Sequence, residues 1–176
     1  MKKNWFVTLA AVALVLSLGM NTEVYTQSKG KPKGKSSSLT TAKEIGRDGR
    51  FIAYDNGTVS DTRTNLMWAA KDNGSDINWA GAMSYSEYYE GGGYTDWRLP
   101  TQNELAGLYN VNKSYRAIMG SEVHLTELIH LSCVWIWASE TTGSDAAIFQ
   151  FDHGIRNWHG QSSSGSKCAL PVRSGK

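Results

Sequence analysis

The chain has 176 residues, enough for one globular domain with a terminal extension. Its whole-chain pI of about 8.5 suggests a basic protein, but the charges are unevenly distributed. Residues 44–176 hold 11 basic residues against 15 acidic residues, and so a net charge of −4. This acidic balance excludes a uniformly basic domain, and we expect no nucleic-acid partner.

The first 26 residues are typical of a secretory signal peptide. Lys2 and Lys3 precede an uncharged, mostly apolar run of fourteen residues, from Trp5 to Leu18. A helix that spans a bilayer needs about 20 residues, so no stable membrane span is expected. Cleavage is expected after residue 19 or after residue 26, and an uncleaved N-terminal anchor is the alternative. The predicted location is secreted, periplasmic or at the cell surface.

Residues 27–43 are rich in Gly, Ser and Lys and almost free of apolar side chains. Such a segment cannot bury enough apolar surface to offset the entropy of ordering it. We therefore expect a basic, flexible linker, followed by a single globular domain at 44–176.

The domain begins with a pattern of short strands. Residues 51–69 read as strands that are separated by turns, with a tight hairpin signal at 55–57 and a buried strand at 66–68.

Two helices are predicted next. Asn78 is a candidate N-cap for the first, and the three glycines at 91–93 would end that helix. Four residues at helical spacing would form its inner face: Trp79, Ala82, Met83 and Ser86. After a short strand at 97–99, Thr101 and Glu104 form a capping-box pattern that opens the second helix.

The last third of the chain predicts strands. Residues 134–139 carry β-branched and aromatic side chains on both faces, which favours a central strand. Strands at 146–151 and 155–159 would follow, and a closing strand at 168–173. Two helices with a strand-rich second half indicate an α+β fold.

Two cysteines, Cys133 and Cys168, remain after export. In an oxidising compartment such a pair is interpreted first as a disulfide, worth about 3–4 kcal/mol in the chain-entropy treatment. A catalytic or metal-binding thiol pair is the alternative, although the CxxC spacing typical of such sites is absent.

These residues resemble the Lcl C-terminal-like domain family over roughly residues 50–173. The resemblance is carried by the following motifs: residues 56–68 (NGTVSDTRTNLMW), Trp79-x-x-Ala82, residues 92–105 (GGYTDWRLPTQNEL), residues 137–139 (WAS), Phe151-x-x-Gly154 and residues 171–173 (PVR). The family often has a cysteine in its first helix. Tyr85 and Ser86 occupy that region here, so that bond is not expected.

The resemblance implies a C-type-lectin-like fold, with two helices packed on a twisted, mostly antiparallel sheet. The same fold is shared in outline with formylglycine-generating enzymes. Family members are mostly secreted or surface-displayed bacterial proteins, and one branch consists of adhesin tips that bind sulfated polysaccharides. A shared fold does not by itself transfer a function.

The polar motif residues are interpreted as structural. We expect Arg98, between Trp97 and Leu99, to be half-buried and paired with a carboxylate, because a buried guanidinium needs a charged partner. The candidate partners are three acidic residues of the motifs. The structural set is Asp61, Trp68, Asp96, Trp97, Arg98, Pro100 and Glu104.

A weak candidate for a calcium site lies in the loop 72–76, where Asp72, Asn73 and Asp76 could offer oxygen ligands. The loop lacks the full EF-hand pattern, and the Glu-Pro-Asn and Trp-Asn-Asp motifs of calcium-dependent lectins are absent. A solvated turn is the simpler interpretation, so no metal or cofactor is predicted.

The strongest candidate for ligand binding is the run Arg156, Asn157, Trp158 and His159, beside a turn and a Ser/Gly loop. An exposed indole offers a flat apolar face for sugar rings, and its neighbours offer donors for hydroxyls or sulfates. The alternative is a tryptophan that lies back over the edge of the sheet.

The sequence therefore predicts an exported, non-catalytic domain that binds a surface or extracellular glycan, sulfated or not. No histidine or cysteine lies in a recognised catalytic motif, so no catalytic residues are assigned. The alternatives are an enzyme related to the formylglycine-generating group, which depends on a reactive thiol pair, and a structural component of the envelope.

Overall fold

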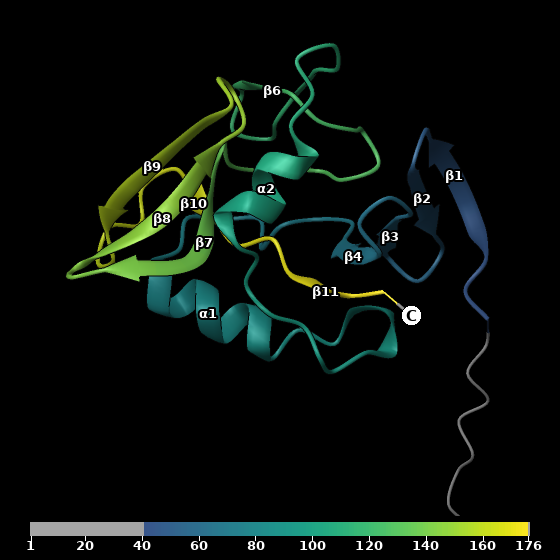
Figure 1. Ribbon diagram of the computed structural model, residues 1–176, viewed down its shortest axis with the longest axis horizontal. Helices are drawn as coiled ribbons and strands as arrows, with labels where there is room; N and C mark the ends of the chain where they lie inside the picture. The colour runs from purple at the N-terminus through teal and green to yellow at the C-terminus, as the bar shows by residue number, and fades with distance from the viewer. Residues whose placement is uncertain (1–40, 176) are drawn as a thin grey trace, which may run out of the picture. The chain divides into compact units, whose positions relative to one another are not determined.

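A computed structural model describes residues 41–175, and its two larger β-sheets are separate from each other (Figure 1). The signal peptide predicted at 1–26, and all but the last three residues of the linker predicted at 27–43, lie outside the described residues. Among residues 41–175 there is no helix with the length and apolar character needed to cross a membrane.

The first sheet has five strands in the order β1-β2-β3-β4-β11, and all its pairs are antiparallel. Its strands are β1 (Glu44–Asp48), β2 (Phe51–Tyr54), β3 (Thr58–Asp61), β4 (Leu66–Ala69) and β11 (Val172–Ser174). The turn predicted at 55–57 joins β2 to β3, and Gly57 N donates to Tyr54 O at 3.1 Å. Gly57 has φ +78°, a conformation that glycine adopts without strain.

The second sheet has four strands in the order β10-β7-β8-β9. These are β7 (Trp135–Thr142), β8 (Asp145–Gln150), β9 (Ile155–Gly160) and the short β10 (Lys167–Cys168). β10 is parallel to β7, whereas the other pairs are antiparallel. β7 thus has a neighbour on each side, which confirms the prediction of a central strand, and β9 is the outermost strand (Figure 1).

In the sequence, the remaining elements come between β4 and β7. They are α1 (Trp79–Glu87), the 3-10 turn η1 (Gly91–Gly93), α2 (Gln102–Leu108) and the two-stranded pair β5 (Tyr115–Arg116) and β6 (Glu122–Val123). Asn78 caps α1 by accepting from Gly81 N. The predicted capping box is present at α2, where Thr101 and Glu104 exchange hydrogen bonds. Satisfied first-turn N–H groups explain why both helices begin where the sequence predicts.

The four-stranded sheet lies between two apolar cores, because successive side chains of a strand point to opposite faces. Ile136, Ala147 and Phe149 face the core that contains Leu105 and Leu108 of α2. On the other face, Trp137, Ala146 and Ile148 pack in a cluster with Ala82 of α1. Ala138 of β7 also belongs to the first of these two cores. The α+β class is therefore confirmed.

Three details differ from the sequence prediction. Residues 97–99 form only an isolated bridge between Arg98 and Val172. Residues 168–173 divide between β10 and β11, in different sheets, because the chain crosses at Pro171, which has no N–H to donate. In α1, Ala82 and Ser86 are buried, but Met83, expected on the inner face, is 37% exposed.

Cys133, just before β7, is bonded to Cys168 of β10, with a Cα–Cα distance of 5.6 Å. Both residues are fully buried. The bond joins the start of the central strand to its parallel neighbour, so the pairing expected from the sequence is confirmed.

We expect unreduced tryptic peptides of the exported protein to show Cys133 and Cys168 linked by mass spectrometry. Reduction should lower the free energy of unfolding by about 3–4 kcal/mol, because the open chain regains loop entropy. A Cys133→Ala/Cys168→Ala variant is the control, and reductant should not change its urea midpoint. Two thiols that are freely alkylated without reduction would contradict the bond.

Candidate functional site

The predicted binding residues Arg156, Asn157, Trp158 and His159 all lie in β9, at the open edge of the four-stranded sheet (Figure 1). Trp158 is 43% exposed, so its indole lies on the surface and is not folded back into the core. The sequence therefore located an accessible aromatic side chain on an edge strand.

The alternation of β9 divides these four residues between two faces. Arg156 is opposite Phe149 of β8, and Trp158 is opposite Ala147, on the face that α2 covers. Asn157 and His159 are opposite Ile148 and Ala146, on the face of α1. The residues predicted as one site are thus two pairs, and only Arg156 shares a face with Trp158.

On the α1 face, His159 is part of a packed corner. Its ring lies 5.1 Å from that of Trp135, and Nζ of Lys167 lies 4.9 Å from the centroid of the same indole. Lys167 also donates to Ser163 Oγ at 3.0 Å and to Gly165 O at 2.9 Å. These two bonds hold the Ser/Gly loop at 161–166 against β10. Burial, and next the charge of Lys167, lower the pKa of His159, while burial lowers the pKa of Lys167. These contacts indicate a structural role for His159.

Asn157 is also occupied by local contacts. Its Oδ1 accepts from Trp158 N at 2.8 Å, and its carbonyl oxygen accepts from Gln102 Nε2 at 3.1 Å. Because Gln102 is the first residue of α2, this second bond connects the helix to the edge strand. Asn157 therefore supports the strand, and the accessible candidate pair is Arg156 with Trp158.

Arg98 is paired with a motif carboxylate, as the sequence predicts, but its side chain is 44% exposed and it is not part of the core. It forms two hydrogen bonds with Glu104, at 2.8 and 2.6 Å, on the outside of the α2 capping box. Burial opposes ionisation of Glu104, but hydrogen bonds from Arg98 and Thr101 outweigh it and lower the pKa of the carboxyl. The apolar members of the predicted structural set are buried as expected: Trp68, Trp97 and Pro100.

The buried guanidinium of this region belongs to Arg173, whose side chain is 2% exposed. It donates to both carboxylate oxygens of Asp96, at 2.6 and 2.9 Å, and its guanidinium carbon lies 4.0 Å from the ring centroid of Tyr94. Asp61, the third candidate partner, lies 3.1 Å from Arg50 instead. The motif acids are therefore structural, but they serve three different arginines.

The loop 72–76 uses its oxygen atoms to bind backbone N–H groups. Asp72 Oδ2 accepts from Ser132 N at 2.6 Å, and Asn73 Oδ1 accepts from Ala169 N at 2.7 Å. Asp76 Oδ1 accepts from the backbone of the loop before β10 at 3.0 Å. The candidate calcium ligands thus hold this loop against the segments that carry the disulfide.

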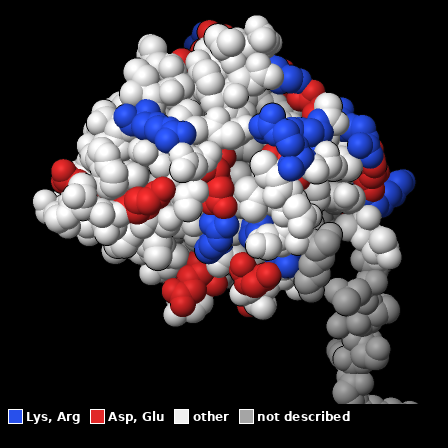
Figure 2. Space-filling model, viewed as in Figure 1, with Lys and Arg blue, Asp and Glu red and all other residues white. Residues whose placement is uncertain are grey.

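The surface has a larger hollow that sequence analysis missed. Two adjoining hollows, of about 510 and about 340 Å³, share Asp48 and Lys113 in their walls. We call the pair the Lys113 trough. Its polar lining consists of Arg47, Asp48, Arg50, Arg63, Asn110, Asn112, Lys113, Ser114, Thr126 and Glu127. Figure 2 shows Lys and Arg side chains gathered on the visible face near the strands β1–β3, at the right of the view.

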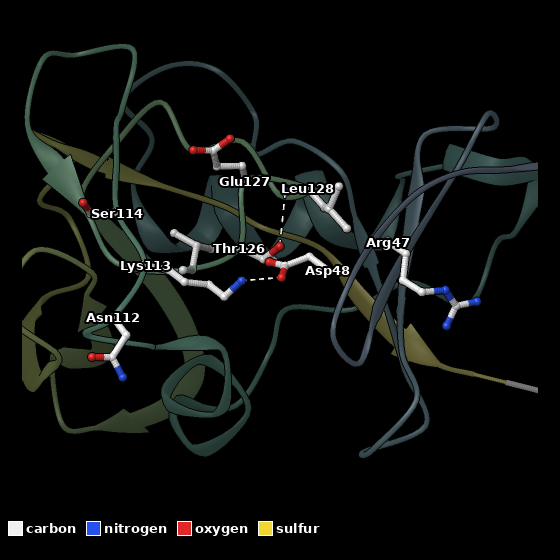
Figure 3. A pocket seen from close by; sticks show the side chains of 9 residues that line it. Arg47, Asp48, Asn112, Lys113, Ser114, Thr126, Glu127 and Leu128 are labelled. Atoms are coloured by element: carbon white, nitrogen blue, oxygen red, sulfur yellow. Dashed lines mark hydrogen bonds and ion pairs between the residues drawn. The ribbon is translucent and has the colours of Figure 1, made fainter.

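Figure 3 shows the interactions of Asp48 and Lys113, the two residues that both hollows of the trough share. The carboxylate of Asp48 points toward the ammonium group of Lys113, with which it forms an ion pair, and toward Thr126, while Arg47 points away from this group. The hydrogen bonds from Lys113 and then Thr126 lower the pKa of Asp48. The larger hollow is therefore close to neutral at its centre.

The smaller hollow has an excess of positive charge. Arg50 lies over the ring of Phe51, at 4.6 Å from its centroid, and donates to Gly107 O. Arg63 is exposed, and its side chain forms no ion pair or hydrogen bond with any residue in 41–175. Arg50 is paired with Asp61 and Lys113 with Asp48, so Arg63 is the cation of this hollow that has no carboxylate partner among residues 41–175.

The smaller hollow lies on the same side of the four-stranded sheet as Arg156 and Trp158 of β9. Tyr109 lines the hollow, and its ring centroid is 6.0 Å from that of Phe149, the strand partner of Arg156. Gly154, in the turn before β9, lies so close to Tyr109 that a Cβ there would be 2.8 Å from its ring. A long ligand could therefore contact both regions without crossing to the other face.

No local pattern could have revealed the trough. Its cations come from residues 47–50, 63 and 113, which are separated by many residues and show no basic run. Only the pairing of β1 with β2, and the packing of the 112–114 segment against Asp48, bring them together.

The family model described as Lcl C-terminal domain matches residues 57–173. None of the curated proteins searched matches the chain. The match begins within the β2–β3 turn and ends inside β11, so it includes both helices, the disulfide and β9.

We predict that Arg173→Ala lowers the free energy of unfolding by about 3 kcal/mol, because it removes a large buried side chain with its packing against Tyr94 and its two hydrogen bonds to Asp96. Arg98→Ala is the matched control and should cost about 1 kcal/mol or less, as expected for an exposed pair. Urea denaturation of both variants provides the comparison. An equal or larger loss of stability for Arg98→Ala would show that this region depends on Arg98 more than on Arg173.

We also predict that His159 titrates below the usual histidine value of about 6.5 in an NMR pH titration. Because the folded-state pKa is below the unfolded-state pKa, this histidine's contribution to stability is complete above a pH of about 6.5 and is lost as the pH falls from there through the lower, folded-state pKa. Lys167→Met should raise the midpoint of His159, since one positive neighbour is gone, whereas Lys113→Met should not change it. An unchanged midpoint in Lys167→Met would disprove the electrostatic contribution.

Proposed function

The chain belongs to the Lcl C-terminal domain family, and on that premise we propose that it is an exported, non-catalytic domain that binds an extracellular glycan. Family membership supports the fold and not the ligand, so the proposal depends on the accessible side chains of this chain. Export follows from the predicted signal peptide at 1–26.

The observation that carries the proposal is the exposure of Trp158 on the same face as Arg156. Sugar rings stack on flat aromatic faces through their axial C–H groups, and a guanidinium donates to hydroxyl, carboxylate or sulfate oxygens. β9 holds both side chains on a paired strand, so little conformational entropy is lost when a ligand binds.

The Lys113 trough supports a sulfated or otherwise anionic glycan as the ligand class. Residues 44–176 carry 11 basic against 15 acidic residues, so an anionic polymer needs a local excess of positive charge. In the smaller hollow Arg50 and Lys113 are paired with carboxylates, and the unpaired Arg63 supplies the excess, on the same side as Arg156. The proposed ligand would therefore stack at Trp158 and place anionic groups at the hollow.

The enzyme alternative has less support. An enzyme of the formylglycine-generating type needs reactive thiols, and both cysteines of this chain are buried in one disulfide. A component with a purely structural role in the envelope would need neither an exposed tryptophan nor a basic hollow. We assign no catalytic residue, metal or cofactor.

We predict that Trp158→Ala weakens binding to both dextran sulfate and unsulfated dextran about 10-fold, because stacking does not depend on sulfate. Arg63→Ala should weaken only the binding of dextran sulfate. The effect of Arg63→Ala should fade as salt approaches 1 M, where the Debye length is about 3 Å. Surface plasmon resonance at several salt concentrations provides the measurement.

The matched control is Tyr88→Ala, which removes an aromatic side chain that is 79% exposed outside β9. Its binding should equal that of the wild type. A deletion of residues 27–43 tests the predicted basic linker, and should weaken dextran sulfate binding at low salt only. If that deletion abolishes all binding while Trp158→Ala changes nothing, the binding site is in the linker and the proposal for β9 is wrong.

A further inference from the structure

A third hollow, of about 380 Å³, lies between β5, the turn that follows it and the segments at 71–74 and 130–132. It shares no lining residue with the Lys113 trough. Its volume falls within the range of about 300–1,000 Å³ that is typical of small-molecule sites. We call it the Tyr115 pocket.

The wall of this pocket is apolar because its buried polar groups are already satisfied. The hydroxyl of Tyr115 donates to Ile129 O at 2.6 Å and accepts from Leu131 N at 2.8 Å, so the ring is its remaining contact surface. Burial raises the pKa of Tyr115, and the phenol stays un-ionised. The carboxylate of Asp72 accepts from the backbone N–H groups of Gly74 and Ser132.

Three basic side chains of the lining are exposed: Lys71, Arg116 and His130. Lys71 and His130 are partners in a parallel bridge, which places them side by side. Arg116 donates to Gly120 O at 2.7 Å and retains its other N–H groups. None of the three forms an ion pair with another residue of the described domain.

Ile118 forms an apolar edge of the pocket and is 79% exposed. The next residue, Met119, is also exposed. What points to a small-molecule site is therefore the apolar hollow itself, with a few polar and charged side chains at its rim.

We propose that the Tyr115 pocket binds a small apolar carboxylate, whose hydrocarbon part packs against Tyr115, Ile118 and Leu131. Its carboxylate would lie near the charged groups of Lys71 and Arg116 and the imidazole of His130. An apolar body matches the lining, and a negative charge matches cations that have no acidic partner in the described domain. This site is independent of the proposed glycan surface, because it uses none of the same residues.

The test is a titration of the full exported protein with 3-phenylpropanoate, followed by NMR of isotope-labelled protein. We expect the resonances of Ile118 and Tyr115 to shift with saturation, while those of Trp158 do not move. The alcohol 3-phenylpropan-1-ol has the same apolar body without the charge, and should bind at least 10-fold more weakly.

Variants separate the contributions of charge and apolar packing. The double variant Lys71→Ala/Arg116→Ala should weaken binding of the acid at least 10-fold and leave binding of the alcohol unchanged. Ile118→Ala should weaken the binding of both ligands. Arg63→Ala removes an exposed cation that is not in this pocket, and is the matched control. Near-ultraviolet circular dichroism of each variant verifies that the fold is intact.

Equal affinity for the acid and the alcohol would overturn the role of the cations. Resonance shifts elsewhere, with none at Ile118 and Tyr115, would overturn the pocket. If a short peptide with an apolar C-terminal residue binds and the free acid does not, the hollow is a peptide-docking site and the proposal of a small-molecule ligand is wrong.

Discussion

The structure depends on the way its last segment connects two sheets. Residues 167–168 pair with β7 in one sheet, and residues 172–174 pair with β4 in the other. Each half is held by a side-chain bond: the disulfide at Cys168, and the ion pair between the buried Arg173 and the exposed Asp96. A bridge to Arg98 adds the segment before α2 to the same junction. Because a chain that crosses between sheets cannot continue one ladder, these side-chain bonds supply what the interrupted backbone pairing does not.

Most polar motif residues are used to hold loops in place. Glu104 caps α2, Asp72 and Asn73 bind backbone N–H groups, and Lys167 fastens the Ser/Gly loop. A buried polar group without a partner is costly, so a domain with long irregular segments needs many such bonds. Residues that could bind ligands are those left accessible by this network, and they lie on the surfaces around Trp158, the Lys113 trough and the Tyr115 pocket.

These surfaces have different chemistry because they are built by different elements. Trp158 and Arg156 lie on a regular strand that is paired with β8 along its whole length, which fixes their spacing and their shared face. The trough is formed where β1 and the turn after it meet the 109–114 segment, and its polar lining includes Lys, Arg and Asn side chains. The Tyr115 pocket is lined by β5 and turns that the disulfide-linked region supports, and it is mainly apolar. One small domain therefore presents an exposed tryptophan beside an arginine, a hollow lined by arginine and lysine, and an apolar pocket.

The sequence by itself determined the local structure, which includes the hairpin turn at Gly57, the caps at Asn78 and Thr101 and the central strand β7. It also determined that the two cysteines of the chain pair with each other. These features depend on neighbouring residues, or on there being a single possible pair. Only the tertiary structure decided that Arg173 and not Arg98 is buried, and that β9 divides its four candidates between two faces. It also brought together Arg50, Arg63 and Lys113. Burial and charge clustering are set by contacts between distant segments, which local sequence patterns do not encode.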